Sequence, residues 1–453
     1  MKTGPREKNS RDGNNETQMA VEELKILTKH MDDPDQRHIV TAMSRGAYKQ
    51  LEKALGMTPK EVIELVKKSG LRGRGGAGFP AGLKWSFVPE KADKPKYLCV
   101  NADEGEPGTF MDRLIMERDP HLMLEGIIIC CYAVGMNDAY IYIRGEFVRP
   151  ARILEEAIEE AYAKGFLGES VMGKGFKCHV TVHRGAGAYV CGEETGLIES
   201  LEGKRGQPRL KPPFPAIVGA FAGPTVVNNV ETLANVPRIF EGGPEWFAGI
   251  GSEKNSGTRI FGISGHVEKP GLYELPMGTP IKDLLELAGG VRGKKPLKAI
   301  IPGGSSAPAL APNELDTPMD FDSLGKKGSM AGSGGVIVMD NSVCLVRVTR
   351  RLLEFYSHES CGQCTPCRDG VPWMLQIVSR IEQGQGKPGD IQQILKICDN
   401  IKMRTLCPLG DAAAMPTEGF VKKFKKEFEE HIKTGQCTVK GDLACERGRI
   451  KGH

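Results

Sequence analysis

Long apolar runs and an excess of charge of either sign are both missing from this sequence. No stretch approaches the ~20 apolar residues that cross a bilayer, and residues 1–18 lack the apolar core of a secretory signal. Lysine and arginine total 61 against 57 acidic residues, which gives a net charge of +4. This near balance gives no electrostatic reason to expect nucleic acid or an anionic membrane surface as a partner. We therefore expect a cytoplasmic protein that reaches a membrane only through partner subunits.

The cysteines do not form the dense framework of a small secreted domain. Thirteen are spread over 453 residues, and some stand in apolar runs, as Cys130 and Cys131 do. Such usage is typical of a reducing cytosol. A chain of this length also exceeds one ordinary core, so about two to four domains are expected.

The first half of the chain has the alternating pattern of an α/β domain. Residues 1–20 have the composition of a disordered tail, and the α/β pattern extends over residues 21–248. Thr58, Pro59 and Glu61 predict a capping box and a helix that ends at Gly70. Strands are predicted at 97–100, 140–143 and 179–183, and a helix at 151–164.

Two further units are predicted after the α/β domain. Residues 255–340 have the order strand, turn, strand, helix, strand, strand, which is typical of a β-grasp domain. From 343 to 435 the strands vanish and apolar residues recur at helical spacing, so we expect a helical bundle there. The predicted helices span 345–356, 373–381, 391–401 and 420–432, the last with Phe420, Phe424, Phe428 and Ile432 on one face. A polar tail is expected over 436–453.

The most informative motif is a cysteine triplet with a remote fourth cysteine. Cys361, Cys364 and Cys367 form C-x-x-C-x-x-C, and Cys407 follows in Leu-Cys-Pro. Four such thiolates, placed in loops of the helical region, can surround a [4Fe–4S] cluster. A structural zinc site also takes four cysteines, but it usually comes as two separated C-x-x-C pairs. The spacing therefore favours the cluster and an electron-transfer role.

A glycine-rich segment at residues 71–80 contains a formal G-x-G-x-x-G. The dinucleotide fingerprint needs a strand before it and a helix after, whereas this segment follows a helix and is closed by Pro80. A plain loop is the alternative to a loop that cradles a nucleotide. The residues that follow favour the nucleotide, since they offer rings for stacking and a cation for a phosphate. They are Phe79, Lys84, Trp85 and Phe87.

Polar residues follow the predicted strands at 97–100 and 179–183, at the carboxyl ends where α/β sheets bind ligands. Asn101 and Asp103 come after the first, and Asn228 and Asn229 lie in a Val-Val-Asn-Asn segment. Residues 185–196 form a glycine turn that leads into a helix, where acids ease the helix dipole. Glu193 and Glu194 are therefore either ligand contacts or first-turn residues, and the other polar groups have turn or solvated-loop alternatives.

No metal-binding or catalytic role is predicted for several histidines and cysteines. His179 and His183 are expected to be ordinary strand residues, since no third metal ligand accompanies them. Cys99, Cys191 and Cys398 are expected to be small buried hydrophobic residues. Cys437 and Cys445, in the polar tail, have no evident partner in the sequence.

These motifs together resemble the flavoprotein subunit of bacterial NADH:quinone oxidoreductase, respiratory complex I. The resemblance rests on residues 71–87, 100–109, 185–196 and 228–232 and on the cysteine motif, in the same order over about residues 40–435. It implies a Rossmann-like FMN and NADH domain, a ubiquitin-like β-grasp domain and a helical bundle carrying a [4Fe–4S] cluster. It also implies partners: a thioredoxin-like [2Fe–2S] subunit and a further iron–sulfur subunit, on the cytoplasmic side of the inner membrane.

The resemblance also implies roles for individual residues. The expected FMN contacts are Gly73, Gly75, Lys84, Asn101, Asp103, Gly192, Glu193, Asn228, Asn229 and Thr232. The expected NAD(H) contacts are Phe79, Phe87, Glu106, Tyr189, Glu194, Lys211 and Phe214. The expected cluster ligands are Cys361, Cys364, Cys367 and Cys407.

Hydride transfer from NADH to FMN needs no protein acid or base, so no catalytic side chain is expected and the residues position the two rings. Glu194 is expected to favour NADH over NADPH, because an acid near the ribose repels a 2′-phosphate. One alternative is the diaphorase subunit of a NAD-linked hydrogenase or formate dehydrogenase, although such chains often carry further ferredoxin-like C-x-x-C domains. A non-enzymatic alternative is a zinc-stabilised nucleotide-binding scaffold.

Overall fold

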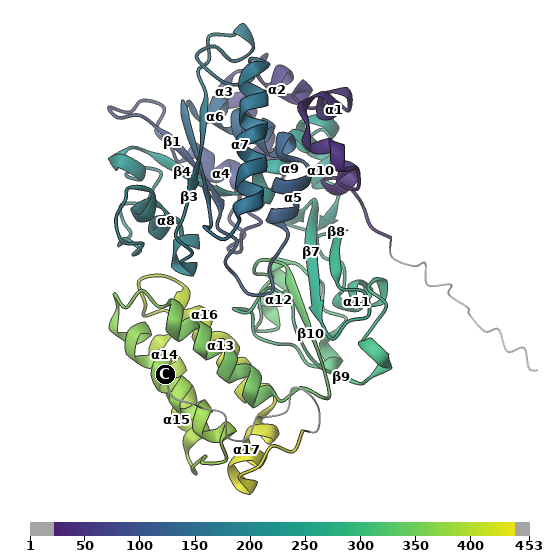
Figure 1. Cartoon of the computed structure of the whole chain (residues 1–453), viewed down its shortest axis with the longest axis vertical. Helices are drawn as coiled ribbons and strands as arrows, with labels where there is room; N and C mark the ends of the chain where they lie inside the picture. The colour runs from purple at the N-terminus through teal and green to yellow at the C-terminus, as the bar shows by residue number, and fades with distance from the viewer. Residues whose placement is uncertain (1–21, 440–453) are drawn as a thin grey trace, which may run out of the picture.

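The computed structural model describes residues 22–439 and consists of three packed domains (Figure 1). An α/β domain lies at one end of the long axis, a helical domain lies at the other, and a smaller mixed domain packs beside both. No helix within residues 22–439 combines the length and the apolar character needed to cross a bilayer.

A four-stranded parallel sheet organises the α/β domain. Its strand order is β3-β2-β1-β4, with β1 at Tyr97–Ala102, β2 at Asp138–Ile143, β3 at His179–Arg184 and β4 at Thr225–Asn229. Successive side chains of a strand point to opposite faces. Leu98 and Val100 accordingly enter one apolar core, whereas Cys99 between them enters another.

Parallel sheets are covered by helices on both faces, and the helices of this domain pack on the sheet or on one another. They are α1 Ile39–Ser44, α2 Lys49–Ala54, α3 Pro59–Lys68, α4 Ala81–Ser86, α5 Asp112–Arg118, α6 Pro120–Val134, α7 Val148–Ala163, α8 Glu194–Leu201, α9 Val230–Gly242 and α10 Pro244–Ala248. Apolar residues of α6, α7 and α9 fill the first core, and those of α8 enter the second.

The predicted capping box at Thr58 is present. The Thr58 hydroxyl oxygen accepts from the Glu61 backbone N–H, and the Glu61 carboxylate accepts from the Thr58 N–H. The helix α3 ends at Lys68, with Gly70 in the left-handed region at φ +68°. This helix leads directly into the glycine-rich segment.

The mixed domain has a second four-stranded sheet of order β8-β7-β10-β9, in which only β7 and β10 are parallel. Its strands and helices are β7 Thr258–Gly265, β8 Gly271–Pro276, α11 Ile281–Leu287, β9 Leu297–Ile301, α12 Phe321–Lys326 and β10 Gly335–Asp340. A small hairpin, β5 Gly251–Ser252 and β6 Asn255–Ser256, precedes it. The predicted strands and α11 occur in the expected order, whereas α12, between β9 and β10, was not predicted.

The helical domain consists of α13 Leu345–Glu359, α14 Thr365–Glu382, α15 Asp390–Ile401, α16 Leu409–Lys423 and α17 Lys425–Thr434. The prediction of one helix over 420–432 is wrong, because Phe424 leaves the helical region at φ −116°, ψ 30° and separates α16 from α17. A four-residue repeat drifts by roughly 40° per step around a straight helix. Phe420 and Phe428 lie on the two sides of the break, and both are fully buried.

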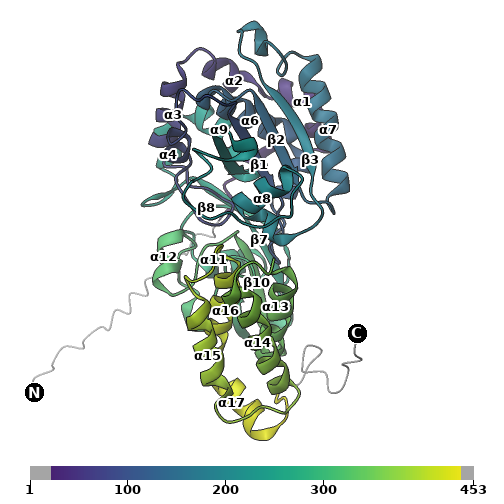
Figure 2. The ribbon, with the colours of Figure 1, turned by 90° about the vertical axis from the view of Figure 1, so that its left-hand side faces the viewer.

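The second core joins the helical domain to the sheet. Cys99 and Leu197 of the α/β domain belong to the same apolar cluster as Val346, Leu353 and Tyr356 of α13. Figure 2 shows the helical domain directly below α8 and the lower end of the sheet. The cysteine motif is therefore held close to that end of the sheet.

Candidate functional site

The polar residues expected at the ends of strands share one edge of the parallel sheet. Asn101, near the carboxyl end of β1, stands opposite Asn229 at the end of β4. Asp103 follows β1 directly, and Asn228 precedes Asn229. The parallel register thus confirms that these four side chains belong to the same edge, where α/β sheets bind ligands.

The glycine-rich segment folds back on itself and packs against this edge. The Gly73 N–H donates to the Phe79 carbonyl at 2.8 Å, and the buried Arg74 donates its backbone N–H to the Thr232 hydroxyl at 2.8 Å. A Cβ on Gly75 would lie 2.9 Å from the Cβ of Asn229. Only glycine allows this close approach of the loop to the start of α9.

Asp103 lies in a cradle formed by two glycines. Its Oδ2 would be 2.9 Å from a Cβ on Gly105 and 3.4 Å from one on Gly192. The side chain is 2% exposed, and burial raises its pKa to about 7, although Arg144 opposes the shift. No hydrogen bond to the carboxylate comes from residues 22–439. A buried acceptor beside two glycines fits a ligand that brings its own hydroxyl donors.

The turn before α8 fixes the position of Gly192 and the adjacent acids. The Asn101 amide donates to the Gly192 carbonyl at 2.8 Å. Glu193 is the N-cap of α8, since one carboxylate oxygen accepts from the N–H groups of Thr195 and Gly196. One carboxylate oxygen of Glu193 thus caps the helix start, and the other receives Lys211.

Two lysines neutralise the acids at this turn. Lys211 donates to Glu193 at 2.9 Å and to Glu194 at 3.2 Å, and Lys84 donates to Glu194 at 3.4 Å. Burial acts to raise the pKa of Glu193, but hydrogen bonds from Thr195 and Lys211 bring it below its usual range. Lys84 also donates to the Val227 carbonyl at 3.2 Å, which connects α4 to β4.

The two asparagines of β4 are already paired with protein groups. Asn228 accepts from the indole N–H of the buried Trp85 at 2.8 Å. Asn229 caps α9 by accepting from the Thr232 N–H at 3.1 Å, and its amide donates to Asp112. These contacts position both side chains before any ligand binds.

Three aromatic side chains near this edge remain exposed. Phe79 and Phe87 are 41% and 51% exposed, with ring centroids 6.0 Å apart and planes tilted by 50°. Phe214, three residues after Lys211, is 58% exposed. Large exposed rings are costly in water and mark a surface for a planar ligand.

Glu106 and Tyr189 are joined at the junction of the domains. The Tyr189 hydroxyl donates to Glu106 at 2.6 Å, and the backbone N–H of Ser306 in the mixed domain donates to the same carboxylate at 2.7 Å. Ser305 also donates to Glu106, at 3.2 Å, and its hydroxyl lies 2.6 Å from the Tyr356 hydroxyl of α13. This carboxylate therefore connects the three domains.

The four predicted cysteine ligands line one hollow. Cys361, Cys364, Cys367 and Cys407 face it together with Pro208, Ser360, Gln363, Leu406 and Leu409. The expectation that all four stand in loops is wrong for Cys367, which is the third residue of α14, because that helix begins at Thr365 rather than at 373. Cys364 is the N-cap of the same helix.

The chemistry of this donor set fits a metal cluster. Burial raises the pKa of Cys367 to about 11 and that of Cys407 to about 12, and the neighbouring thiols of the set add to both shifts. Thiolates so disfavoured need a cation to stabilise them. Four converging thiols in an apolar hollow are the ligand set of a [4Fe–4S] cluster.

The hollow adjoins the turn before α8. Pro208, from the segment after α8, forms part of its wall, and the Gln207 amide donates to the Cys361 carbonyl at 3.4 Å. The Glu193 and Tyr189 side chains lie close enough to Cys407 to interact with it electrostatically. Residues 189–194 thus lie between the sheet edge and the cysteines.

Sequence reasoning missed several supporting residues. Pro208 covers the thiols, Asp112 orients Asn229, and the Glu359 carboxylate accepts from the Tyr189 backbone N–H at 2.9 Å. Asp112 is the first residue of α5, and an acid in the first turn of a helix needs no ligand to explain it, so its sequence pattern did not indicate a site residue. No local pattern connects Pro208 or Glu359 to the site, because their partners lie far away in sequence.

Comparison with protein families gives three matches in chain order. A family model described as the Nuo51 FMN-binding domain matches residues 66–238. The SLBB domain matches residues 260–308. The NADH-ubiquinone oxidoreductase-F iron-sulfur binding region matches residues 347–431. The first and third matches cover the sheet edge and the cysteine hollow.

Individual relatives agree with these matches. The F 2 subunit of NADH-quinone oxidoreductase in Rhizobium meliloti (strain 1021) is 55% identical over 414 residues, which are 91% of this chain and 98% of the relative. The F subunit of NADH-quinone oxidoreductase in Mycobacterium bovis is 49% identical over 419 residues, 91% of this chain and 94% of the relative.

Solved structures of an NAD+-reducing [NiFe]-hydrogenase have the same fold. The H2-reduced form matches with a TM-score of 0.78 at 36% identity and covers 85% of this chain. The air-oxidized form matches with a TM-score of 0.80 at 34% identity and covers 91%. The matched regions are 64% and 67% of the hydrogenase chains, so this chain spans about two thirds of their length.

Proposed function

The chain belongs to the family of NADH-quinone oxidoreductase F subunits, and we propose that it is the NADH-oxidising component of a quinone-reducing complex. As a member of this family it is an oxidoreductase that uses FMN, a [4Fe–4S] cluster and NADH. When bound, FMN supplies a two-electron acceptor that can release electrons singly, and the cluster supplies a one-electron relay.

The residues proposed to hold FMN surround the sheet edge. The unpaired Asp103 carboxylate and the Gly105 and Gly192 cradle support this assignment, because a ribityl chain carries hydroxyl donors. The Gly75 backbone packs against the side chain of Asn229, so the glycine-rich loop lies directly at this edge. The proposed set is Gly73, Gly75, Lys84, Asn101, Asp103, Gly192, Glu193, Asn228, Asn229 and Thr232.

The residues proposed to meet NADH lie beside this set. Phe79, Phe87 and Phe214 offer exposed rings that would hold a planar base or nicotinamide. Glu106 and Tyr189, which are joined by a hydrogen bond, would contact NADH as one pair. Lys211 and Glu194, which are also hydrogen-bonded, would contact it as a second pair. No proton needs to pass through these residues; their role is to place the substrate and exclude water.

Glu194 is the proposed selector of NADH over NADPH. Its carboxylate is the shared partner of Lys84 and Lys211, so it cancels much of the positive charge that would attract a 2′-phosphate. The same carboxylate can accept a hydrogen bond from a 2′-hydroxyl. This specificity depends on the charge of Glu194.

The observation that carries the proposal is that the two sites adjoin. Within residues 189–194, Gly192 is hydrogen-bonded to Asn101 at the sheet edge. In the same segment, Glu193 lies close enough to Cys407 to interact with it electrostatically. Cys361, Cys364, Cys367 and Cys407 would hold the cluster across this turn. A pair of electrons accepted at one site can therefore leave singly through the neighbouring site.

A diaphorase subunit of a hydrogenase or formate dehydrogenase is the second candidate. The hydrogenase chains share the fold, yet this chain covers only 64–67% of their length at 34–36% identity. The relatives in the NADH-quinone oxidoreductase family are matched over 94–98% of their length at 49–55% identity. The relatives thus favour the quinone-linked complex, and the flavin and iron–sulfur matches leave no support for a zinc scaffold.

The proposal includes partners and a location. A thioredoxin-like [2Fe–2S] subunit and a further iron–sulfur subunit would receive electrons, on the cytoplasmic side of the inner membrane. Family membership supports these assignments, since the named relatives are subunits of a larger oxidoreductase.

Anaerobic purification of the tagged chain with its co-purifying subunits tests the proposal. We expect FMN equimolar with the chain, non-haem iron together with acid-labile sulfide, and quinone reduction driven by NADH. Hydrogen- or formate-dependent reduction of NAD+ without quinone reduction would support the second candidate. A colourless preparation without flavin would overturn both.

A further inference from the structure

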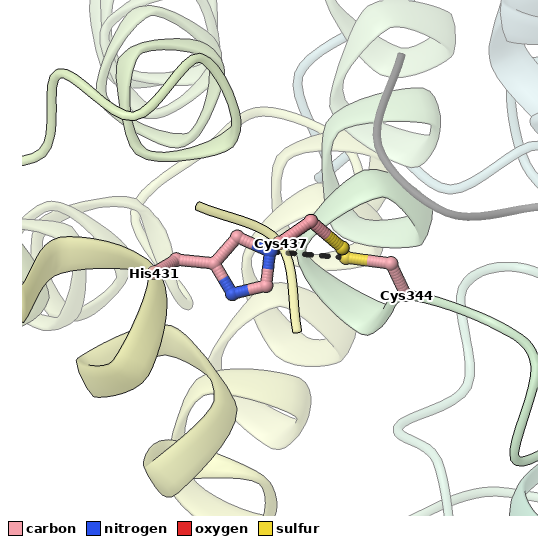
Figure 3. Close-up of side chains that lie close together, drawn as sticks. All are labelled: Cys344, His431 and Cys437. Atoms are coloured by element: carbon pink, nitrogen blue, oxygen red, sulfur yellow. Dashed lines mark hydrogen bonds between the residues drawn. The ribbon is translucent and has the colours of Figure 1, made fainter. Parts of the chain in front are cut away.

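A second group of metal-binding side chains lies in the helical domain, apart from the four-cysteine hollow. The Sγ atoms of Cys344 and Cys437 and a ring nitrogen of His431 all lie within 4.8 Å of one another (Figure 3). Cys344 precedes α13, His431 lies in the last turn of α17, and Cys437 follows that helix. Cys437, for which the sequence shows no evident partner, thus lies beside two other potential ligands.

The imidazole of His431 is oriented as in known metal sites. Its Nδ1 lies 2.8 Å from the Glu427 backbone carbonyl, so Nδ1 carries the proton that makes this hydrogen bond. Its Nε2 then faces the thiols, 3.4 Å from the Cys344 Sγ. A metal-ligating histidine usually donates its other ring N–H to a carbonyl or carboxylate, which fixes the tautomer.

The surroundings also suit a metal. Cys344 and His431 are fully buried, whereas Cys437 is half-buried and gives access from solvent. Glu427, one turn before His431, receives the Leu345 backbone N–H at 2.9 Å and Lys298 at 2.8 Å, so it holds the starts of α13 and α17 together. The three candidate ligands are thus supported by the fold and do not depend on flexible surface side chains.

We propose that Cys344, His431 and Cys437 bind one zinc ion. Two thiolates and an imidazole are soft and borderline donors that select zinc and related transition metals over magnesium or calcium. Three protein ligands leave the fourth tetrahedral position for water or another donor. Cys445, the next cysteine in the sequence, lies outside the described residues.

The site would bind together the two ends of the helical domain. Cys344 is the residue at which the chain leaves the mixed domain and begins α13, and Cys437 follows the last helix. A metal bound to both closes this domain on itself, and such metal binding contributes directly to folding. The inference is independent of the proposed redox function.

Metal analysis of the anaerobically purified complex tests the inference. We expect about one zinc ion per chain in addition to the iron. In Cys437→Ser and His431→Gln the zinc content should fall on the order of tenfold or more, with iron and FMN unchanged. Because Cys437 is half-buried, its serine variant should fold, and retained iron and FMN report that it has done so.

X-ray absorption at the zinc edge identifies the ligands without interference from iron or flavin. We expect two sulfur neighbours at about 2.3 Å and one nitrogen at about 2.0–2.1 Å from these side chains. Cys398→Ala is the matched control, since Cys398 is a buried cysteine of α15 that contacts Met374 instead. Absence of zinc from the wild-type chain grown with zinc, or zinc that persists in both variants, would overturn the inference.

Discussion

The sheet edge and the cysteine hollow differ in how far their polar groups are already paired with other protein groups. At the edge most polar groups already have protein partners, such as Asn228 with Trp85 and Lys211 with Glu193. In the hollow, burial keeps the thiols of Cys367 and Cys407 protonated, with pKa values of about 11 and 12. The edge is therefore assembled before its ligand binds, whereas the hollow is completed by the metal.

Because of this difference, we expect mutations at the sheet edge and in the cysteine hollow to have different effects. A change at the edge removes one contact among several, so we expect a graded change in affinity or specificity. A change of one thiolate in the hollow removes a ligand that nothing else replaces. The following predictions test this contrast, starting with the largest expected effect.

Cys364→Ser should abolish cluster binding and leave the flavin in place. We expect iron to fall by about four atoms per chain and NADH-driven quinone reduction to be lost, with FMN content unchanged. Iron analysis, flavin absorbance and quinone assays measure this in the purified complex. Cys398→Ala is the control for loss of a buried thiol. Joint loss of FMN and iron would show that the two sites are not prepared separately.

Asp103→Asn should remove a pH dependence of FMN binding. Burial raises the Asp103 pKa from 3.8 to about 7, so the flavin-free protein retains a proton there that the unfolded chain releases near pH 4. The free energy of unfolding of the flavin-free protein therefore falls as the pH rises from about 4 to about 7, because the folded protein binds a proton that the unfolded chain has lost. Hydroxyl donors of FMN favour the ionised form, so affinity should rise up to about tenfold per pH unit below 7.

Fluorescence titration of the flavin-free chain with FMN between about pH 6 and 8 measures this slope. The Asn variant should bind more weakly at the upper end and show a smaller slope than the wild-type chain. Asp138→Asn, at the amino end of β2, is the control. A wild-type affinity independent of pH would contradict the assignment of Asp103 to the flavin.

Glu194→Gln should relax the preference for NADH. The loss of the carboxylate leaves Lys84 without its acidic partner and Lys211 paired with Glu193 alone, so the positive charge available to a 2′-phosphate rises. We expect the ratio of kcat/KM for NADPH to that for NADH to rise about tenfold, equivalent to ~1.4 kcal/mol. Steady-state rates with both nucleotides provide the measurement, and Glu199→Gln on the same helix is the control. An unchanged ratio would remove this role.

Phe87→Leu should have the smallest effect. Removing an aromatic interaction worth ~0.5–1.5 kcal/mol should raise the KM for NADH about two- to tenfold while kcat stays nearly constant. Phe221→Leu is the control, because Phe221 packs on Tyr97 at the amino end of β1, and it is also exposed. A drop in kcat without a change in KM would mean that Phe87 acts on the flavin and not on the nucleotide.

The sequence predicted those features that depend on neighbouring residues. The capping box at Thr58 and the strands β1, β2 and β3 follow from local pattern, whereas the strand β4, which carries Asn229 to the side of Asn101, was not predicted. The pattern also failed at Phe424, because apolar residues at four-residue spacing continue across the break between α16 and α17. No local pattern connects Cys437 to Cys344, which is separated from it by the whole helical domain.

The carboxylate of Glu106 has a consequence for motion during turnover. It accepts hydrogen bonds from the α/β and mixed domains, and Ser305 extends the connection to Tyr356 of the helical domain. Opening a hinge at this point would exchange these hydrogen bonds for bonds to water, at a net cost of about 1.5–3 kcal/mol for each bond to the charged group. The joint therefore favours the closed arrangement of the three domains, and any opening of the structure between substrate binding and product release has to break it.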